Sequence, residues 1–182
     1  MPELPEVETT RAGLAPALVG RTLVRVEVRD PRLRWPVPAD LPARLAGRRL
    51  SGIARRGKYL LFDFGGLRQL VHLGMSGSLR LIAPDEPPAA HDHVDWVFDG
   101  GVTLRLRDPR RFGAVLLADA ATTHPLLARL GPEPLTDAFD AAHLRARCQG
   151  RSTAIKQVIM DGHVVVGVGN IYASESLFHA GI

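Results

Sequence analysis

The segment VDWVFDGGVTLRLR, residues 94–107, decides the fold class of this chain. On both sides of Asp99-Gly100-Gly101, apolar residues recur at every second position, which is typical of strands with one buried face. The glycine-rich triplet between the two runs predicts a hairpin turn. The segment therefore predicts two antiparallel strands, at residues 94–98 and 102–107.

Similar patterns continue outward in both directions. The further predicted strands are Thr22–Arg29, Arg49–Arg55, Lys58–Phe64, Gln69–Leu73, Ser78–Ile82 and Ala114–Leu117. Gly65-Gly66 predicts a second hairpin turn. Seven or eight short strands separated by Gly, Pro and Asp turns indicate an antiparallel β-sandwich. A helix at Pro5–Leu18 precedes the strands, because proline suits a first helical turn and Gly20 follows its end.

Beyond residue 118 the periodicity becomes helical. The predicted helices are Pro125–Leu130, Ala141–Cys148, Thr153–Met160 and Tyr172–Ala180. Gly131-Pro132-Glu133-Pro134 is typical of a linker. The sequence thus predicts an α+β chain with an antiparallel β-sandwich domain at 1–131, including its N-terminal helix, and a helical domain at 132–182.

The composition suits a polyanionic partner without proving one. The chain has 182 residues and a net charge of +4, and all its basic residues except Lys58 and Lys156 are arginine. Lysine is therefore expected where arginine is a poor substitute. The single cysteine, Cys148, excludes a disulfide framework and a cysteine-based zinc site within these residues. No apolar run approaches the ~18 residues of a membrane span, and no signal peptide is evident, so a cytoplasmic location is expected.

The N-terminus offers a nucleophile. Removal of Met1 would expose the secondary amine of Pro2, and α-amines titrate near ~7.7–8.0 in reference peptides. Attack of such an amine on a sugar anomeric carbon gives an iminium, as a Schiff-base lysine does. Glu3 and Glu6 lie within one helical turn and could move protons. The alternative is that Pro-Glu-Leu-Pro-Glu only begins a helix.

Two further patterns have a functional and a structural interpretation. His91, His93 and Asp95 are expected on one face of a strand, where they could bind a metal, a phosphate or neighbouring backbone. Because catalytic zinc generally needs three protein ligands, we favour the phosphate or structural role. The segment 167–170 joins two helices, and Asn170 is predicted to cap a helix beginning at Ile171, whose N-terminus could bind phosphate.

Long motifs along the whole chain resemble formamidopyrimidine-DNA glycosylases, a family that also includes endonuclease VIII. They are MPELPEVET at residues 1–9, RGKYL at 56–60, HLGMSGSLR at 72–80, HDHVD at 91–95, DPRRFG at 108–113, LGPEPL at 130–135 and GVGNIYASE at 167–175. The resemblance implies a β-sandwich followed by a helix–two-turn–helix domain. The family's pattern continues beyond Ile182 with a four-cysteine zinc finger, so the resemblance implies C-terminal truncation and no zinc or other cofactor in these residues.

The resemblance also implies roles for particular residues. Pro2 is expected to be the nucleophile, Glu3 a proton donor, and Lys58 the catalytic lysine that contacts the damaged nucleotide. The side chains expected to wedge into the DNA stack where a base is flipped out are those of Met75, Arg110 and Phe112. The residues expected to contact DNA are His91, Arg110, Arg151, Lys156 and Asn170.

The implied function is base-excision repair. The chain is expected to remove oxidised purines such as 8-oxoguanine and formamidopyrimidines from double-stranded DNA, and to cleave abasic sites by β- and δ-elimination. It is expected to act as a monomer, away from membranes. Two rival hypotheses remain: a non-catalytic DNA-binding fragment, and a metalloenzyme built on His91 and His93.

Overall fold

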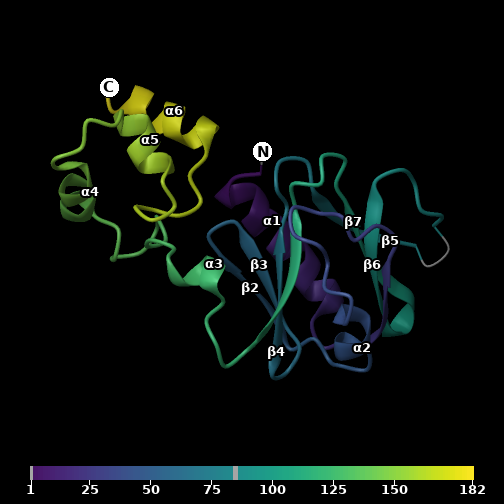
Figure 1. Ribbon diagram of the computed structural model, residues 1–182. Helices are drawn as coiled ribbons and strands as arrows, with labels where there is room; N and C mark the ends of the chain where they lie inside the picture. The colour runs from purple at the N-terminus through teal and green to yellow at the C-terminus, as the bar shows by residue number, and fades with distance from the viewer. Residues whose placement is uncertain (1, 84–85) are drawn as a thin grey trace. The chain divides into compact units, whose positions relative to one another are not determined.

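The structure, a computed structural model, describes residues 2–83 and 86–182. The chain divides into two units, which are described separately here (Figure 1). The first unit extends to Arg55 and again from Tyr59 to Thr123. The second unit comprises Arg56–Lys58 and His124–Ile182. The short excursion at residues 56–58 therefore makes the second unit discontinuous in sequence.

Two four-stranded sheets form the framework of the first unit. Its strand orders are β1-β6-β7-β5 in one sheet and β2-β3-β4-β8 in the other. The elements in this part of the chain are α1 (Leu4–Leu18), β1 (Leu23–Val28), α2 (Leu41–Leu45), β2 (Gly52–Arg56), β3 (Tyr59–Asp63), β4 (Leu67–His72), β5 (Ser78–Ile82), β6 (Asp92–Phe98), β7 (Val102–Arg107) and β8 (Ala114–Asp119), with a 3-10 turn at Asp99–Gly101.

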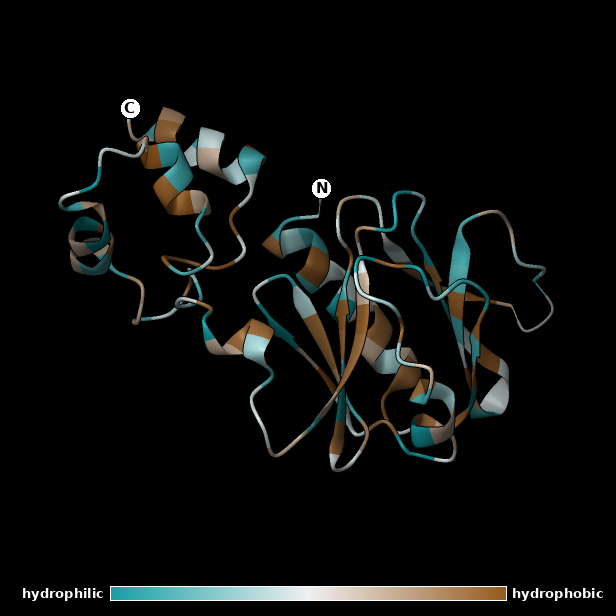
Figure 2. Ribbon diagram, viewed as in Figure 1, coloured by the Kyte–Doolittle hydropathy of each residue, from teal (hydrophilic) through white to brown (hydrophobic). Residues whose placement is uncertain are grey.

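The core of the first unit is made by the apolar faces of both sheets and of α1. In Figure 2 much of the ribbon of the β-strands is brown, the colour of hydrophobic residues. Leu60 on one sheet, Phe98 on the other sheet and Leu18 on α1 are all buried in this core. Trp96 Nε1 donates a hydrogen bond of 3.0 Å to Gln69 Oε1, which joins the two sheets inside the core. Burial of this apolar surface is the main force that holds the sheets face to face.

Two loops cross between the sheets at the same end of the first unit. The first crossing loop, residues 73–77, leads from β4 to β5, and the second crossing loop, residues 108–113, leads from β7 to β8. His72 pairs with Ala114 in one sheet, and Ser78 pairs with Arg107 in the other. Because paired residues flank both loops, the strand register itself places the loops side by side.

The second unit is built around the apolar triplet Val164–Val166, which is buried. The backbone N–H of Val166 donates to the Pro132 carbonyl at 3.0 Å. The ring of His143 is hydrogen-bonded to the Val164 carbonyl at 2.9 Å. The helices of this unit are α3 (Pro125–Ala128), α4 (Ala141–Cys148), α5 (Ile155–Met160) and α6 (Asn170–His179).

The structure confirms the predicted fold class, with some corrections. The eight strands lie within three residues of their predicted ends, and the two predicted hairpin turns join β3 to β4 and β6 to β7. Asn170 is not the cap of α6, because α6 begins at Asn170 and Gly169 is the residue that precedes its first turn. The short helix α2 was not predicted. Among the described residues, no helix is both long and apolar enough to span a membrane.

Candidate functional site

The start of α1 holds the predicted nucleophile and proton donor next to each other. Glu3 is buried, at 2% exposure, whereas Pro2 is partly exposed. The N–H of Glu3 donates to the Glu6 carboxylate at 2.8 Å, and the Glu3 carboxylate in return accepts the backbone N–H of Glu6. Such a reciprocal capping box fixes the first turn of a helix. Pro2 is therefore attached directly to a rigid element, which is what positioning of a nucleophile requires.

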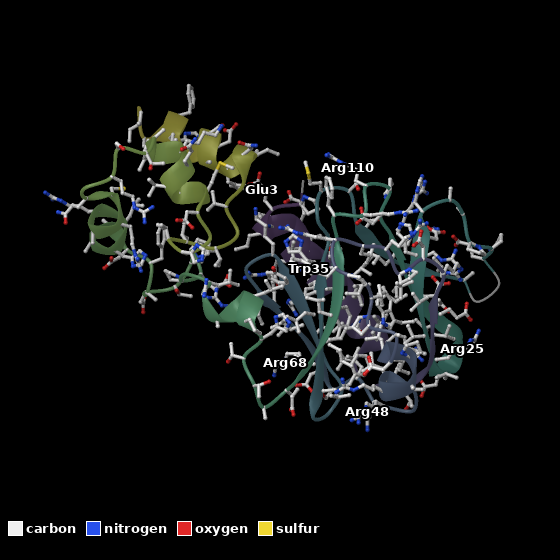
Figure 3. All side chains as sticks on the ribbon, in the orientation of Figure 1. Glu3, Arg25, Trp35, Arg48, Arg68 and Arg110 are labelled. Atoms are coloured by element: carbon white, nitrogen blue, oxygen red, sulfur yellow. The ribbon has the colours of Figure 1, made fainter. Side chains whose placement is uncertain are left out.

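The two crossing loops bring the three predicted wedge residues together. Met75, Arg110 and Phe112 line one surface hollow of about 670 Å³. Met75 is 41% exposed and Phe112 is 44% exposed, so both large apolar side chains are open to solvent. Figure 3 labels Arg110, which lies on the second crossing loop. Its guanidinium group lies 4.9 Å from the centre of the Phe112 ring. The hollow thus combines exposed apolar surface with a cation.

Two other arginines line the same hollow, and each has a local partner. Arg111 adopts φ +57°, and its guanidinium group binds Asp30 at 2.8 Å. Hydrogen bonds from the side chain and backbone of Arg32, with a smaller contribution from Arg111, hold the pKa of the Asp30 carboxyl well below its ordinary value. Arg34 stacks on Trp35, with its guanidinium carbon 4.7 Å from the ring centre. Positive charge therefore dominates this part of the surface.

Sequence reasoning assigned no role to three polar residues of the hollow, Arg34, His72 and Arg111. His72 Nδ1 accepts the N–H of Gly74 at 3.0 Å, which fixes the orientation of the imidazole ring. The centre of the ring lies 4.8 Å from that of the Tyr59 ring. Burial raises the pKa of the Tyr59 phenol, and the positive charge of Arg34 offsets part of this increase. His72 begins the motif HLGMSGSLR, which also contains Met75, so the motif was a signal that could have identified His72 as a site residue.

The histidine pattern on β6 does not form the predicted shared face. His91 lies before the strand, is exposed and has φ +72°, whereas His93 is buried at 3% exposure. The pairing of β6 with β7 shifts register between Asp92 and Val94, and this irregularity breaks the expected alternation. His93 Nε2 is hydrogen-bonded to the Asp108 carbonyl at 2.8 Å.

Asp95, the third member of that pattern, has a structural role. Its carboxylate accepts hydrogen bonds from Arg105 at 2.8 and 2.7 Å and from Arg29 at 2.6 Å. Within residues 2–83 and 86–182, no group of three or more His, Cys, Asp and Glu side chains could hold a metal ion. The geometry therefore gives the metalloenzyme hypothesis no support.

Lys58 belongs to the second unit, where it contacts the segment before α6. Its ammonium group donates to the Val168 carbonyl at 3.0 Å. Glu133 Oε1 accepts hydrogen bonds from the guanidinium group of Arg56 at 2.9 Å and from the N–H of Gly57 at 2.7 Å. Gly57 itself has φ +57°, a left-handed conformation that favours glycine. These contacts fix the turn that carries the lysine.

The remaining predicted DNA contacts also lie in the second unit. Lys156, on α5, donates to the Ser174 hydroxyl on α6 at 2.9 Å. Arg151 lies 3.6 Å from an Asp161 carboxylate oxygen. A hydrogen bond from the backbone N–H of His163 lowers the pKa of the Asp161 carboxyl below its usual range, and this effect outweighs burial, which raises the pKa. Asn170 is exposed at the first position of α6. The cations are thus held on the surface of this unit by polar side chains.

Comparison with known proteins assigns both units to one family. Residues 1–115 match the model of the formamidopyrimidine-DNA glycosylase N-terminal domain. Residues 130–182 match the model of the formamidopyrimidine-DNA glycosylase H2TH domain. These two matches cover most of the chain and follow the order of its two units.

Curated relatives agree with the family models. The chain is 75% identical over 182 residues to a formamidopyrimidine-DNA glycosylase of Thiobacillus denitrificans, and the match covers 100% of this chain and 67% of that protein. It is 62% identical over 183 residues to a protein of the same name from Methylococcus capsulatus, covering 100% of this chain and 68% of the relative. The chain therefore spans about two thirds of the length of these relatives.

Solved structures show the same fold. A complex of the Lactococcus lactis Fpg with DNA that contains an abasic site has a TM-score of 0.91 and 36% identity, over 99% of this chain and 67% of that one. A MutM structure in complex with DNA that contains carbocyclic 8-oxo-G has a TM-score of 0.92 and 36% identity, over 100% of this chain and 68% of that one. The domain models, the relatives and the fold lead to one conclusion: the chain belongs to the formamidopyrimidine-DNA glycosylase family.

Proposed function

We propose that this DNA glycosylase removes oxidised purines from double-stranded DNA and then cleaves the abasic site, with the amine of Pro2 as nucleophile. The observation that carries the proposal is the capping box at the start of α1, which fixes Glu3 directly beside Pro2. The relatives supply the substrate class, because their structures contain DNA with an abasic site or an oxidised guanine analogue. Chemistry at C1′ needs a nucleophile and a proton donor in fixed positions, and these two residues meet that need.

The proposed reaction attaches the sugar covalently to Pro2 before the strand is cleaved. The lone pair of the Pro2 nitrogen forms a bond to C1′ as the bond from C1′ to the base breaks, and the base leaves with the electron pair. The Pro2 nitrogen loses its proton, and the departing base takes up one proton in exchange. Glu3 donates a proton to the ring oxygen O4′ as the C1′–O4′ bond opens to give the iminium. A proton is then lost from C2′ to water as the 3′ phosphate leaves with its bonding electron pair, and loss of a proton from C4′ expels the 5′ phosphate in the same way. Water hydrolyses the final iminium and releases the amine.

The hollow between the crossing loops supports recognition of a flipped nucleotide. Extruding a base costs a few kcal/mol of lost stacking, which inserted side chains offset. Met75 and Phe112 are exposed apolar groups of the kind that enter base stacks, and Arg110 beside them offers donors for the base left unpaired. We propose that these three side chains fill the vacated space. His91, Arg151, Lys156 and Asn170 are proposed to contact the surrounding DNA.

No reaction step is assigned to a metal. The four-cysteine zinc finger implied by the family resemblance cannot be formed by these 182 residues, because Cys148 is their single cysteine. Nucleophilic catalysis by an amine needs no metal. We also propose that the chain acts as a monomer.

Borohydride trapping tests the proposed function. Borohydride reduces an iminium to a stable amine, so the chain should become covalently attached to DNA that contains an abasic site or 8-oxoguanine. An undamaged duplex of the same sequence is the control, and a chelator should leave the yield unchanged. Binding to abasic DNA without any crosslink would instead identify a non-catalytic DNA-binding protein.

A further inference from the structure

A buried carboxylate joins the two crossing loops. Asp108 is fully buried, at 0% exposure. Its Oδ1 accepts the hydroxyl of Ser76 at 2.6 Å, and its Oδ2 accepts the N–H of Gly113 at 2.7 Å. The Ser76 oxygen in turn accepts the N–H of Arg110 at 3.1 Å. The Ser76 hydroxyl therefore connects the first crossing loop to the second at two points, the Asp108 carboxylate and the backbone of the wedge residue Arg110. The bond from Gly113 to Asp108 links the two ends of the second crossing loop.

The backbones of the crossing loops also fit closely together. Gly74 has φ +62°, and a Cβ atom added there would collide with the backbone of Phe112 and Gly113. A Cβ atom added at Gly113 would lie 2.9 Å from Asp108 Oδ2 and 2.9 Å from the His72 carbonyl. Both positions therefore require glycine, and the loops have little room to move independently.

Asp108 also fixes the segment that carries His91. Its N–H donates to the His91 carbonyl at 3.0 Å, and its own carbonyl is hydrogen-bonded to His93 Nε2 at 2.8 Å. His91 adopts φ +72°, a conformation that is uncommon for a residue with a side chain. The hydrogen bonds around Asp108 thus reach three separate segments: the two crossing loops and residues 91–93, where β6 begins.

We infer that Asp108 is a positioning residue that holds Met75, Arg110 and Phe112 as one rigid wedge. This inference rests on the proposed function, since it assigns a role in base extrusion. Because Asp108 is buried, it acts through Ser76 and the backbone rather than by touching DNA. A wedge must keep its shape while the stacked bases push against it, and charge-assisted hydrogen bonds to a carboxylate supply that rigidity.

Four variants separate positioning from general stability. Ser76→Ala removes the hydroxyl that links Asp108 to Arg110, whereas Ser76→Thr retains a hydroxyl. Asp108→Ala removes both hydrogen bonds of the carboxylate, to Ser76 and to Gly113. Asp95→Ala is the matched control, because Asp95 is also a buried carboxylate of the first unit but binds Arg29 and Arg105. If Asp108→Ala fails to fold, Ser76→Ala still tests the inference.

The first measurement is amide hydrogen exchange in the free 182-residue chain. Peptides that cover residues 73–77 and 108–113 should exchange faster in Ser76→Ala and in Asp108→Ala than in the wild type. Ser76→Thr should restore slow exchange. Asp95→Ala should leave the exchange of these peptides unchanged relative to the other peptides of the first unit, because any loss of stability there acts on the whole unit. Equal exchange in Ser76→Ala and wild type overturns the inference.

The second measurement is discrimination between a duplex with a tetrahydrofuran abasic analogue and the same duplex without it. A 2-aminopurine base beside the analogue reports unstacking by its fluorescence. Loss of one charge-assisted hydrogen bond should lower the affinity ratio about tenfold in Ser76→Ala. The fluorescence rise should fall with it, and the salt dependence of binding should stay as in the wild type. Faster exchange with unchanged discrimination also overturns the inference.

Failure of the proposed function gives a different pattern. If the wild-type chain shows no preference for the abasic duplex and no borohydride crosslink, the proposed function is wrong, and the wedge role of Asp108 is overturned with it. The exchange measurement on the free chain still decides whether Asp108 braces the loops, because it uses no DNA.

Discussion

The ammonium group of Lys58 donates a hydrogen bond of 3.0 Å to the carbonyl of Val168, 110 residues later in the sequence. The turn that carries Lys58 is held independently, since Arg56 and Gly57 both bind the Glu133 carboxylate. Lys58 can therefore be substituted without removing the contacts that hold its turn. This separation makes the role of its amine accessible to mutation.

Replacement of Lys58 by arginine should lower cleavage of abasic DNA. Arginine keeps the positive charge but cannot give up a proton near neutral pH, whereas an ammonium group can. General acid–base catalysis typically contributes on the order of 10²–10⁴ in rate, so we expect at least about a hundredfold slower strand cleavage in Lys58→Arg. Gel analysis of single-turnover cleavage measures this effect. Wild-type cleavage by Lys58→Arg would show that Lys58 acts only as a charge.

Loss of Arg110 should change base preference more than salt dependence. If its guanidinium group binds the unpaired cytosine, Arg110→Ala should lower the preference for cytosine opposite the lesion by about 1–3 kcal/mol. Competition binding to duplexes with each of the four opposite bases measures this. An equal loss of affinity for all four duplexes would assign Arg110 to the phosphate backbone instead.

Removal of the side chain of Arg151 or Lys156 should change the salt dependence of DNA binding but not the base preference. If each neutralises one phosphate, each alanine variant should reduce the slope of log affinity against log salt by roughly 0.9, without changing base preference. Asp161→Asn is an informative companion, because it removes the carboxylate 3.6 Å from Arg151 and should strengthen binding. Unchanged slopes in both alanine variants would exclude these two residues from the DNA interface.

The ends of a strand could be predicted accurately from the sequence where turn residues flank it on both sides. β5 and β7 begin and end at their predicted residues, because turn residues interrupt the alternation sharply on both sides. The helix α2 was missed because it has five residues, too few for helical periodicity, and includes Pro42. The helix start at Asn170 was displaced by one residue, since glycine and asparagine can both precede a first turn.

The candidate site could be predicted only in part. The wedge residues were found through a family resemblance, whereas their proximity follows from the pairings of His72 with Ala114 and of Ser78 with Arg107. Long-range register of this kind is not encoded in either loop. The link between Ser76 and Asp108 was missed for the same reason, because the two residues are 32 positions apart.

Stability of the first unit should decrease in acid partly through Asp95. Burial raises the pKa of this carboxyl, but hydrogen bonds and charges from Arg105 and Arg29 outweigh burial and leave the pKa below its ordinary value. A lowered folded-state pKa stabilises the fold above the unfolded-state value of about 3.9, and that stabilisation is lost as the pH falls through the lower folded-state value.

The Asp95→Asn variant tests this linkage. Its free energy of unfolding should be lower than that of the wild type near pH 7, by about 3–5 kcal/mol if breaking a buried ion pair has its usual cost. The difference should shrink below about pH 4, where the wild-type carboxyl loses its advantage. Urea titrations at several pH values measure both curves. Parallel curves from pH 7 to pH 2 would mean that Asp95 does not contribute to the acid sensitivity.

Borohydride trapping with a blocked N-terminus tests whether the Pro2 amine is the nucleophile. A chain with an uncleaved N-terminal tag keeps every side chain but converts the Pro2 nitrogen to an amide without nucleophilic character. Its affinity for abasic DNA without borohydride serves as the control for folding. The processed chain should form a covalent adduct, Pro2→Gly a weaker one, and the tagged chain none. Undiminished crosslinking by a tagged chain would contradict Pro2 as the nucleophile.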